Sequence, residues 1–536
     1  MKKILIALGI LFLCGLGLFT IKSHAAELDI TISASDGSDG QDLLDEDPWS
    51  QEPFEVGTTV TIQAQEPIDS LYIKWGGKEP SPCTLDDGGS TVPIGEDGFL
   101  HEYVKLSGTS NSVTITIKED DTTFADIFAF SAGELPDYVQ QWKQPWDKAD
   151  ILVIPAHADD EALFFSGIIP IYTNENRARV QAVLFSDHVT TGEHWRPHEF
   201  LDSLWVLGVD HYPVFGPFID EYSESLEEAE GLLDKEEGLE FIVEELRRFK
   251  PQVVVTHDRK GEYGHGTHMF VCERLLEALE ISQDSSKYPD SAQTYGTWDV
   301  PKTYIHLWPE NKIETDTRAP LSSFGGKNAF ELGKEAYDQH LSQAWTWYYV
   351  DDGYDENGNP NGYEYSIAKY GLARTTVGLD SGTNDVMENL VAYDLQSSDP
   401  EKQETQPTEE ATTSSPEKQE KKKSGNTALI IVLIAVLLVI LLIDILLFAL
   451  IRKLKKQEEI ERLERVRRAD QARRTRPQTS PDQMNQPRRS GQSSRPVRTT
   501  RSNQQSRPTR PVQAPRSSQA NRETRTSQTR RPRNPR

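Results

Sequence analysis

Strict alternation of apolar and polar residues marks the first part of the chain. Residues 60–64, 70–75 and 113–117 place an apolar side chain at nearly every second position, between clusters of Gly, Asp and Pro. A period of two residues is typical of strands that bury one face. We therefore predict a small β-sandwich domain over residues 27–135. A spacer is the favoured role for this domain, and carbohydrate binding is the alternative.

From residue 151 onward, short apolar runs alternate with stretches of helical periodicity. The predicted buried strands are 151–155, 180–186, 251–256 and 304–307. The predicted helices are 162–172, 198–208, 236–250 and 267–280. Repeated strand–helix units predict an α/β fold, so residues 145–385 are assigned to a second domain with a Rossmann-like parallel sheet. Sheets of this kind bind ligands beyond the carboxyl ends of their strands.

An apolar run also lies at the start of the chain. Lys2 and Lys3 precede it, and small residues follow at Ser23 and Ala25. Basic residues, an apolar stretch and small residues at the cleavage site are the features of a secretory leader. We predict a signal peptide over 1–26, with an uncleaved anchor as the alternative.

A second apolar run, residues 427–451, contains only Thr427 and Asp444 as polar residues. At about 1.5 Å per residue, a helix of this length crosses the ~30 Å hydrocarbon core of a bilayer. It is therefore predicted to be a transmembrane helix. Residues 386–426 are polar and contain proline, which predicts a stalk without a packed core. Residues 452–536 form an Arg-rich tail, in which residues 475–536 have almost no apolar side chains and are predicted to be disordered.

The net charge of −28 conceals an asymmetry between two parts of the chain. Residues 27–426 hold 77 acidic and 29 basic side chains, whereas residues 452–536 hold 7 acidic and 25 basic ones. Basic residues accumulate on the cytoplasmic side of membrane proteins. We therefore expect a single-pass protein of the cell membrane with an extracellular catalytic domain and a cytoplasmic tail. The tail is expected to contact anionic lipids or a cytoplasmic partner, without specific DNA binding.

Candidate chemistry follows two of the predicted strands. His157, Asp159 and Asp160 come directly after the first, and His265 and His268 follow the strand 251–256. Two such groups at strand ends suggest one shared metal site. Two imidazoles and a carboxylate leave coordination positions open, as in catalytic zinc centres. Zn²⁺ is the expected cofactor, with Fe²⁺ or Co²⁺ as alternatives. Cys83 and Cys272, the two cysteines of residues 27–426, imply no disulfide framework.

These motifs resemble the signatures of a known family. AHADDE at 156–161 is similar to its AHPDDE signature, and YGHGTH at 263–268 is similar to its YGHPDH signature. Arg196 and Glu199, before Leu207-Gly208, match a third element. On these residues the chain resembles, over about 150–380, the LmbE-like (PIG-L) family of zinc-dependent N-acetylglucosamine deacetylases.

The resemblance implies a role for each matching residue. The implied metal ligands are His157, Asp160 and His268. Asp159 would be the general base, and His265 the general acid or oxyanion stabiliser. Tyr263 would assist the tetrahedral intermediate, and Arg196 would lie near the substrate. His188 follows the strand 180–186 and is expected to line the substrate pocket.

Several neighbouring residues need a separate interpretation. Thr267 stands where the family has an Asp that keeps the adjacent histidine protonated, which leaves the pKa of His265 open. Asp258 or Glu262 is the candidate substitute for that carboxylate. Glu161 is interpreted as a first-turn helix carboxylate. His340 is considered either as a packed residue or as part of the pocket rim.

The sequence thus predicts a metal-dependent hydrolase that removes N-acetyl groups from GlcNAc-type amino sugars in an extracellular glycan or glycolipid. One alternative is an amidase acting on another amide of an amino-sugar conjugate. Another is a non-catalytic, glycan-binding surface scaffold. The expected partners are the N-acetylated substrate and, through residues 427–451, the membrane.

Overall fold

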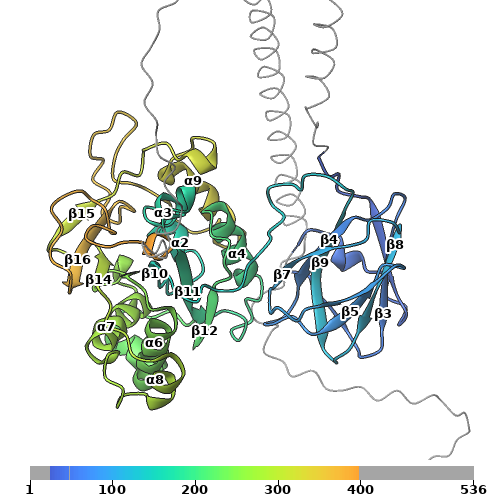
Figure 1. The fold of residues 1–536 in the computed structure, drawn as a ribbon, viewed down its shortest axis with the longest axis horizontal. Helices are drawn as coiled ribbons and strands as arrows, with labels where there is room; N and C mark the ends of the chain where they lie inside the picture. Colours follow the sequence, from blue (N-terminus) through green and yellow to red (C-terminus); the bar gives the residue numbers. More distant parts are fainter. Residues whose placement is uncertain (1–23, 48, 397–536) are drawn as a thin grey trace, which may run out of the picture. The chain divides into compact units, whose positions relative to one another are not determined.

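The computed structural model describes residues 24–47 and 49–396 (Figure 1). The predicted membrane segment 427–451 and the Arg-rich tail lie outside the described residues, as does most of the predicted signal peptide. Within the described ranges, no helix combines the length and the apolar character that crossing a membrane requires. Residues 24–26 pair with the β-domain, because the backbone N–H of Ala25 donates to the carbonyl oxygen of Glu134 (2.8 Å).

The N-terminal domain consists of two antiparallel sheets, with strand orders β1-β3-β8-β5-β6 and β2-β9-β4-β7. Its strands are β1 Ile30–Ala34, β2 Glu52–Phe54, β3 Thr59–Ala64, β4 Ser70–Trp75, β5 Cys83–Asp86, β6 Thr91–Ile94, β7 His101–Lys105, β8 Ser112–Ile117 and β9 Thr122–Phe130. Alternate residues of both sheets, such as Ile62 and Ile115 from one and Ile73 and Phe124 from the other, fill a shared core.

The second domain is built on a seven-stranded sheet with the order β12-β11-β10-β13-β14-β16-β15. Its strands are β10 Ile151–Val153, β11 Val180–Asp187, β12 Val214–Ile219, β13 Val253–Thr256, β14 Lys302–His306, β15 Lys312–Glu314 and β16 Lys369–Thr375. The first five strands of that order are parallel, whereas β16 pairs antiparallel with both β14 and β15. The order reverses between β10 and β13, which is where sheets of this type bind ligands.

Helices cover both faces of this sheet (Figure 1). The helices are α2 Asp160–Leu163, α3 Ile169–Thr173, α4 Arg196–Val206, α5 Leu226–Leu232, α6 Lys235–Phe249, α7 Gly266–Ile281, α8 Pro289–Tyr295, α9 Ala329–Tyr337 and α10 Tyr393–Gln396. Leu152 of β10 belongs to the core formed with α6 and α7, whereas Ile151 and Val153 belong to the core formed with α2, α3, α4 and α9. Side chains alternate across a strand, so one apolar strand serves two cores.

The single helix predicted over 162–172 is wrong, because the structure has two short helices there. α2 ends at Leu163 and α3 begins at Ile169. Between them, Gly167 lies directly against the backbone carbonyl of Ile367. Pro170 then occupies the first turn of α3, a position where proline is tolerated. The long apolar run misled the prediction because both halves are buried, although they do not share one helix axis.

The predicted start of the stalk at residue 386 is also corrected. Val386 is fully buried, and the hydroxyl of Tyr393 in α10 donates to the carbonyl of Lys250 (2.7 Å). The backbone N–H of Tyr393 donates to Asp150 (2.8 Å). Residues 386–395 therefore pack on the α/β domain, since their few apolar and aromatic side chains find partners that a composition argument does not reveal.

Gly167→Ala tests the close approach between the two short helices. A Cβ at this position would lie 1.9 Å from the carbonyl oxygen of Ile367, so the backbone must shift. Overpacking of this kind costs about 1–3 kcal/mol, and we expect the urea unfolding midpoint to fall accordingly. Gly231→Ala in α5 is the control, because a Cβ there meets nothing within 4 Å. Equal midpoints for the two variants would contradict the packing described.

Candidate metal centre

The two histidine-containing segments meet at the edge of the sheet where the strand order reverses. His157 and Asp159 lie on the loop that leaves β10 and Asp160 begins α2, whereas His265 and His268 lie at the start of α7 after β13. β10 and β13 are adjacent and parallel, so their carboxyl ends lie side by side. The structure thus brings together the two groups that the sequence places more than 100 residues apart.

Three side chains form the centre of this cluster. Nδ1 of His157 lies 3.1 Å from Nε2 of His268. The carboxylate of Asp160 lies 3.4 Å from each of these nitrogens. A tetrahedral zinc ion with bonds of about 2.0–2.1 Å separates neighbouring ligand atoms by roughly 3.3 Å. The three side chains therefore lie at about the spacing expected of ligands around one divalent metal, although Oδ2 of Asp160 is the oxygen near His157 and Oδ1 the one near His268.

Carboxylates on the outer side of both rings support the same arrangement. Nδ1–H of His268 donates to Oε2 of Glu262 (2.8 Å). Nε2 of His157 lies 3.5 Å from Asp220 and has no closer hydrogen-bond partner among the described residues. A carboxylate on one ring nitrogen fixes the tautomer that leaves the other nitrogen for a metal. Each histidine thus turns its remaining nitrogen toward the centre.

Glu262 connects the loop after β13, helix α7 and strand β14. Its Oε2 accepts from His257 (3.0 Å) and His268 (2.8 Å). Its Oε1 accepts from His306 (2.6 Å) and from the backbone N–H of Asp258 (3.0 Å). Burial acts to raise the pKa of this carboxyl, but the charge of His257 and the histidine hydrogen bonds outweigh it and hold the pKa well below its usual range. Glu262 is therefore a buried anion with all its acceptor sites in use.

Asp159 has a different environment from its neighbour Asp160. Its backbone φ of 151° is in a region that non-glycine residues rarely adopt, and its N–H donates to Glu161 (3.0 Å). Its carboxylate lies 3.4 Å from the guanidinium of Arg196. Burial raises the pKa of Asp159 to about 7, while Arg196 acts to lower it. A carboxyl group that exchanges protons near neutral pH suits a general base.

His265 stands beside the three central residues. Its ring stacks on that of His268 at 4.6 Å, and its Nδ1 is buried without a hydrogen-bond partner in the described part of the chain. Burial and the nearby His157 and His268 lower its pKa to about 2. Glu262 does not substitute for the missing carboxylate beside His265, because it bonds His257, His268 and His306 instead. Burial and the two neighbouring histidines thus favour the neutral form of the His265 ring.

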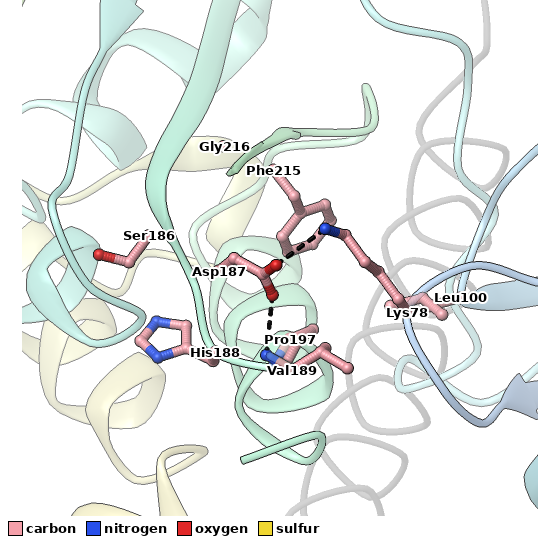
Figure 2. A pocket seen from close by; sticks show the side chains of 9 residues that line it. All are labelled: Lys78, Leu100, Ser186, Asp187, His188, Val189, Pro197, Phe215 and Gly216. Carbon is pink, nitrogen blue, oxygen red and sulfur yellow. Dashed lines mark hydrogen bonds and ion pairs between the residues drawn. The ribbon is translucent and has the colours of Figure 1, made fainter. Parts of the chain in front are cut away.

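The interpretation of His188 as a pocket-lining substrate contact is corrected. Its ring is fully buried, Nε2 accepts from the backbone N–H of Ala158 (3.1 Å), and Nδ1 lies 2.8 Å from Asp220. The cavity that His188 lines has a volume of about 20 Å³ (Figure 2). That is room for about one water molecule, not for a sugar. His188 instead supports the loop after β10, through its hydrogen bond to the backbone of Ala158.

Arg196, Glu161 and His340 also act on this loop. Arg196 donates to the carbonyl of Ala158 in addition to its contact with Asp159. Glu161 accepts from Ser203 (2.5 Å) and from His340 (2.6 Å), so it serves as a buried helix carboxylate. His340 is fully buried and therefore does not lie at the pocket rim.

Tyr263 lies in a group of aromatic rings next to the centre. Its hydroxyl oxygen is 3.4 Å from that of Tyr363, and its ring contacts Trp347, Tyr348 and Tyr365. Its φ of 63° is a left-handed conformation that turns the chain sharply before His265.

Sequence reasoning missed Asp220 and His306. Asp220 follows β12. Pro213 precedes this strand and Pro217 lies inside it, and these two prolines obscured the strand pattern in the sequence. Proline is tolerated there because β12 is the edge strand of the sheet. His306 ends β14. The signal that identifies both is the one used for His157: a polar residue at the carboxyl end of a parallel strand.

Comparison with known proteins confirms the family resemblance. The model of the PIG-L family, described as GlcNAc-PI de-N-acetylase, matches residues 152–279, so this segment carries a PIG-L domain. A 1D-myo-inositol 2-acetamido-2-deoxy-α-D-glucopyranoside deacetylase of Saccharopolyspora erythraea is 29% identical over 198 residues, covering 32% of this chain and 70% of the relative. The match covers 29% and 32% of two further deacetylases of this name, from Catenulispora acidiphila and Geodermatophilus obscurus.

Two other similarities concern an amidase and a solved structure. The mycothiol S-conjugate amidase of Streptomyces coelicolor is 39% identical over 56 residues, which is 10% of this chain and 18% of the relative. The structure of N,N'-diacetylchitobiose deacetylase from Pyrococcus horikoshii is 18% identical, with a TM-score of 0.28, and covers 38% of this chain and 74% of that chain.

Glu262→Gln tests the support of the cluster. The substitution keeps the size of the side chain but removes the charge and replaces one acceptor by an amide donor that faces histidine donors. Loss of such an outer partner costs about 10–100-fold in metal affinity. Competition of the purified protein with a chromogenic chelator for Zn²⁺ measures this loss. Glu240→Gln, an exposed position in α6, removes the same charge and should leave the affinity unchanged. Equal affinities in both variants would contradict the assigned role of Glu262.

Proposed function

We propose that this protein is a metal-dependent hydrolase that removes the N-acetyl group from GlcNAc-type amino sugars in an extracellular glycan or glycolipid. The observation that carries the proposal is the spacing of His157, Asp160 and His268 as ligands of one metal, within the segment that matches the PIG-L family. The extracellular placement rests on the predicted signal peptide and on the predicted membrane segment 427–451, both inferred from sequence.

The proposed metal ligands are His157, Asp160 and His268. When bound, a divalent metal such as Zn²⁺ lowers the pKa of a water molecule and polarises the amide carbonyl. The remaining work is assigned to side chains of this chain. Asp160 is suited to remain a ligand because His268 and His257 outweigh the effect of burial and keep its pKa well below the usual range.

Asp159 is the proposed proton acceptor. With a pKa near 7, it takes a proton from the attacking water and can return it to the departing amine, so one group serves as base and then as acid. His265 enters as a neutral imidazole, because its pKa is far below neutral. Its unpartnered Nδ1 is available for a hydrogen bond to the oxygen that becomes negatively charged in the tetrahedral intermediate.

An amidase acting on another amide of an amino-sugar conjugate is the second candidate. It requires the same attack of water on an amide carbonyl and differs only in which acyl group is removed from the amine. The similarity to a mycothiol S-conjugate amidase favours keeping this candidate. A panel that compares N-acetyl with larger N-acyl amino sugars separates the two.

Acetate release is the direct test of the proposed activity. The purified protein is expected to release acetate from an N-acetylglucosamine-containing substrate, to lose this activity with a chelator, and to regain it on addition of Zn²⁺. Acetate release that survives complete metal removal would contradict the metal mechanism. Asp159→Asn is the matched variant: it should retain bound metal and lose turnover by about 10²–10⁴-fold. Full turnover in this variant would exclude Asp159 as the base.

Arg196→Gln tests whether Arg196 lowers the pKa of the Asp159 carboxyl. The guanidinium lowers the pKa of this carboxyl, so its removal raises the pKa, and the base form then appears only at higher pH. The acidic limb of the kcat/KM–pH profile should move upward by about one unit or more. Arg196→Lys keeps the positive charge and should shift the limb less. A downward shift, or the same profile in all three proteins, would contradict the pairing of Arg196 with a catalytic Asp159.

A further inference from the structure

A group of exposed aromatic side chains lies beside the candidate metal centre. We call Tyr222, Trp345, Trp347 and Tyr349 the aromatic platform; between 50% and 82% of each residue is exposed. Trp345 is the most exposed of them, at 82%. Large apolar rings are normally buried, and a contiguous exposed group of them indicates a binding surface.

Ring contacts connect the platform to the centre. Tyr222 lies edge-on to His265, with ring centroids 5.0 Å apart. Trp347 contacts Tyr263 at 4.8 Å, two residues before His265 in the chain. Tyr348 contacts both Trp347, at 4.6 Å between ring centroids, and Tyr263, at 4.7 Å. Two members of the platform, Tyr222 and Trp347, therefore contact residues of the site where the amide would be cleaved.

The composition of this segment limits what it can bind. Residues 345–365 contain seven aromatic side chains, five carboxylates and no Lys or Arg. Trp and Tyr present a flat apolar face together with a polar atom. A pyranose ring has the complementary shape, with a flat C–H face surrounded by hydroxyl groups. The carboxylates favour a neutral or cationic ligand over an anionic one.

These features fit the product as well as the substrate of the proposed reaction. Each deacetylation turns a neutral amide into an amine that is protonated at neutral pH. A polymer processed at one sugar would thus carry a positive charge on a neighbouring unit, next to the acidic segment. An anionic lipid surface, the other common partner of exposed aromatic side chains, is disfavoured by the same carboxylates.

We propose that the aromatic platform binds the sugar units that flank the one being deacetylated, so that the substrate is an oligomeric or polymeric chain of neutral or partly deacetylated amino sugars. This inference rests on the proposed deacetylase function and specifies its substrate class. The platform residues are substrate-binding groups, separate from those that hold the metal or move protons.

The test compares a disaccharide with a longer oligomer of N-acetylglucosamine. The wild-type protein is expected to have a higher kcat/KM for the longer oligomer. Trp345→Ala should lower that value by about tenfold, the effect of one lost stacking contact, and should leave kcat/KM for the disaccharide unchanged. Trp345→Phe retains an aromatic face and should recover most of the loss. Leu379→Ala removes another exposed apolar side chain and should change neither value.

Binding is measured separately from turnover. Titration of the protein with the longer oligomer should change its tryptophan fluorescence, and a partly deacetylated oligomer should bind more tightly at low salt than at high salt. Equal kcat/KM for both chain lengths, with acetate released from each, would contradict the proposed binding role of the platform but not the proposed deacetylase function. Binding of the oligomer detected by fluorescence, without any acetate release, would contradict the deacetylase function and support the binding role of the platform.

A membrane-binding role gives a different result. Brominated lipids quench tryptophan that enters a bilayer, and the difference between wild type and Trp345→Phe isolates the signal of Trp345. Quenching of this signal, without an effect of Trp345→Ala on the longer oligomer, would overturn the proposal in favour of lipid contact.

Discussion

The buried carboxylate of Glu262 is the interaction on which the centre depends. Removing such a charge from water is costly unless hydrogen bonds compensate for it. Here three histidines and one backbone N–H do so: His257 and the N–H of Asp258 come from the loop after β13, His268 from α7 and His306 from β14. The same bonds that stabilise the anion fix the rings of His257 and His268. The orientation of His268, one of the three proposed metal ligands, is therefore coupled to satisfying one buried charge.

The rest of the site depends on how burial and charge act on two adjacent residues. Asp159 and Asp160 are neighbours in sequence, yet the pKa of Asp159 is raised to about 7 and that of Asp160 is held well below its usual range. The histidines surround Asp160, whereas Asp159 has a single guanidinium and a strained backbone that turns it away from them. Opposite pKa shifts in paired carboxyls distinguish a ligand from a proton carrier.

Sequence reasoning located His157, Asp160 and His268 because each follows a buried strand or begins the next helix, and parallel strands bring such positions to one edge. It did not find Asp220, because two prolines obscured its strand. It also left His265 with an open protonation state and His188 with the wrong role. Those properties depend on which side chains surround a ring, and contacts such as His188 with Ala158 join segments that no local pattern relates.

Access to the centre is restricted on the side of the β-domain. Lys78 of that domain pairs with Asp187 at the end of β11 (2.8 Å), and Leu100 lies against the same small cavity, as Figure 2 shows. A cavity of about 20 Å³ does not admit a sugar. The exposed rings of Tyr222 and Trp347 are in contact with His265 and Tyr263. If the aromatic platform binds a glycan chain as proposed, these contacts would hold neighbouring sugar units beside the centre while a single unit occupies it.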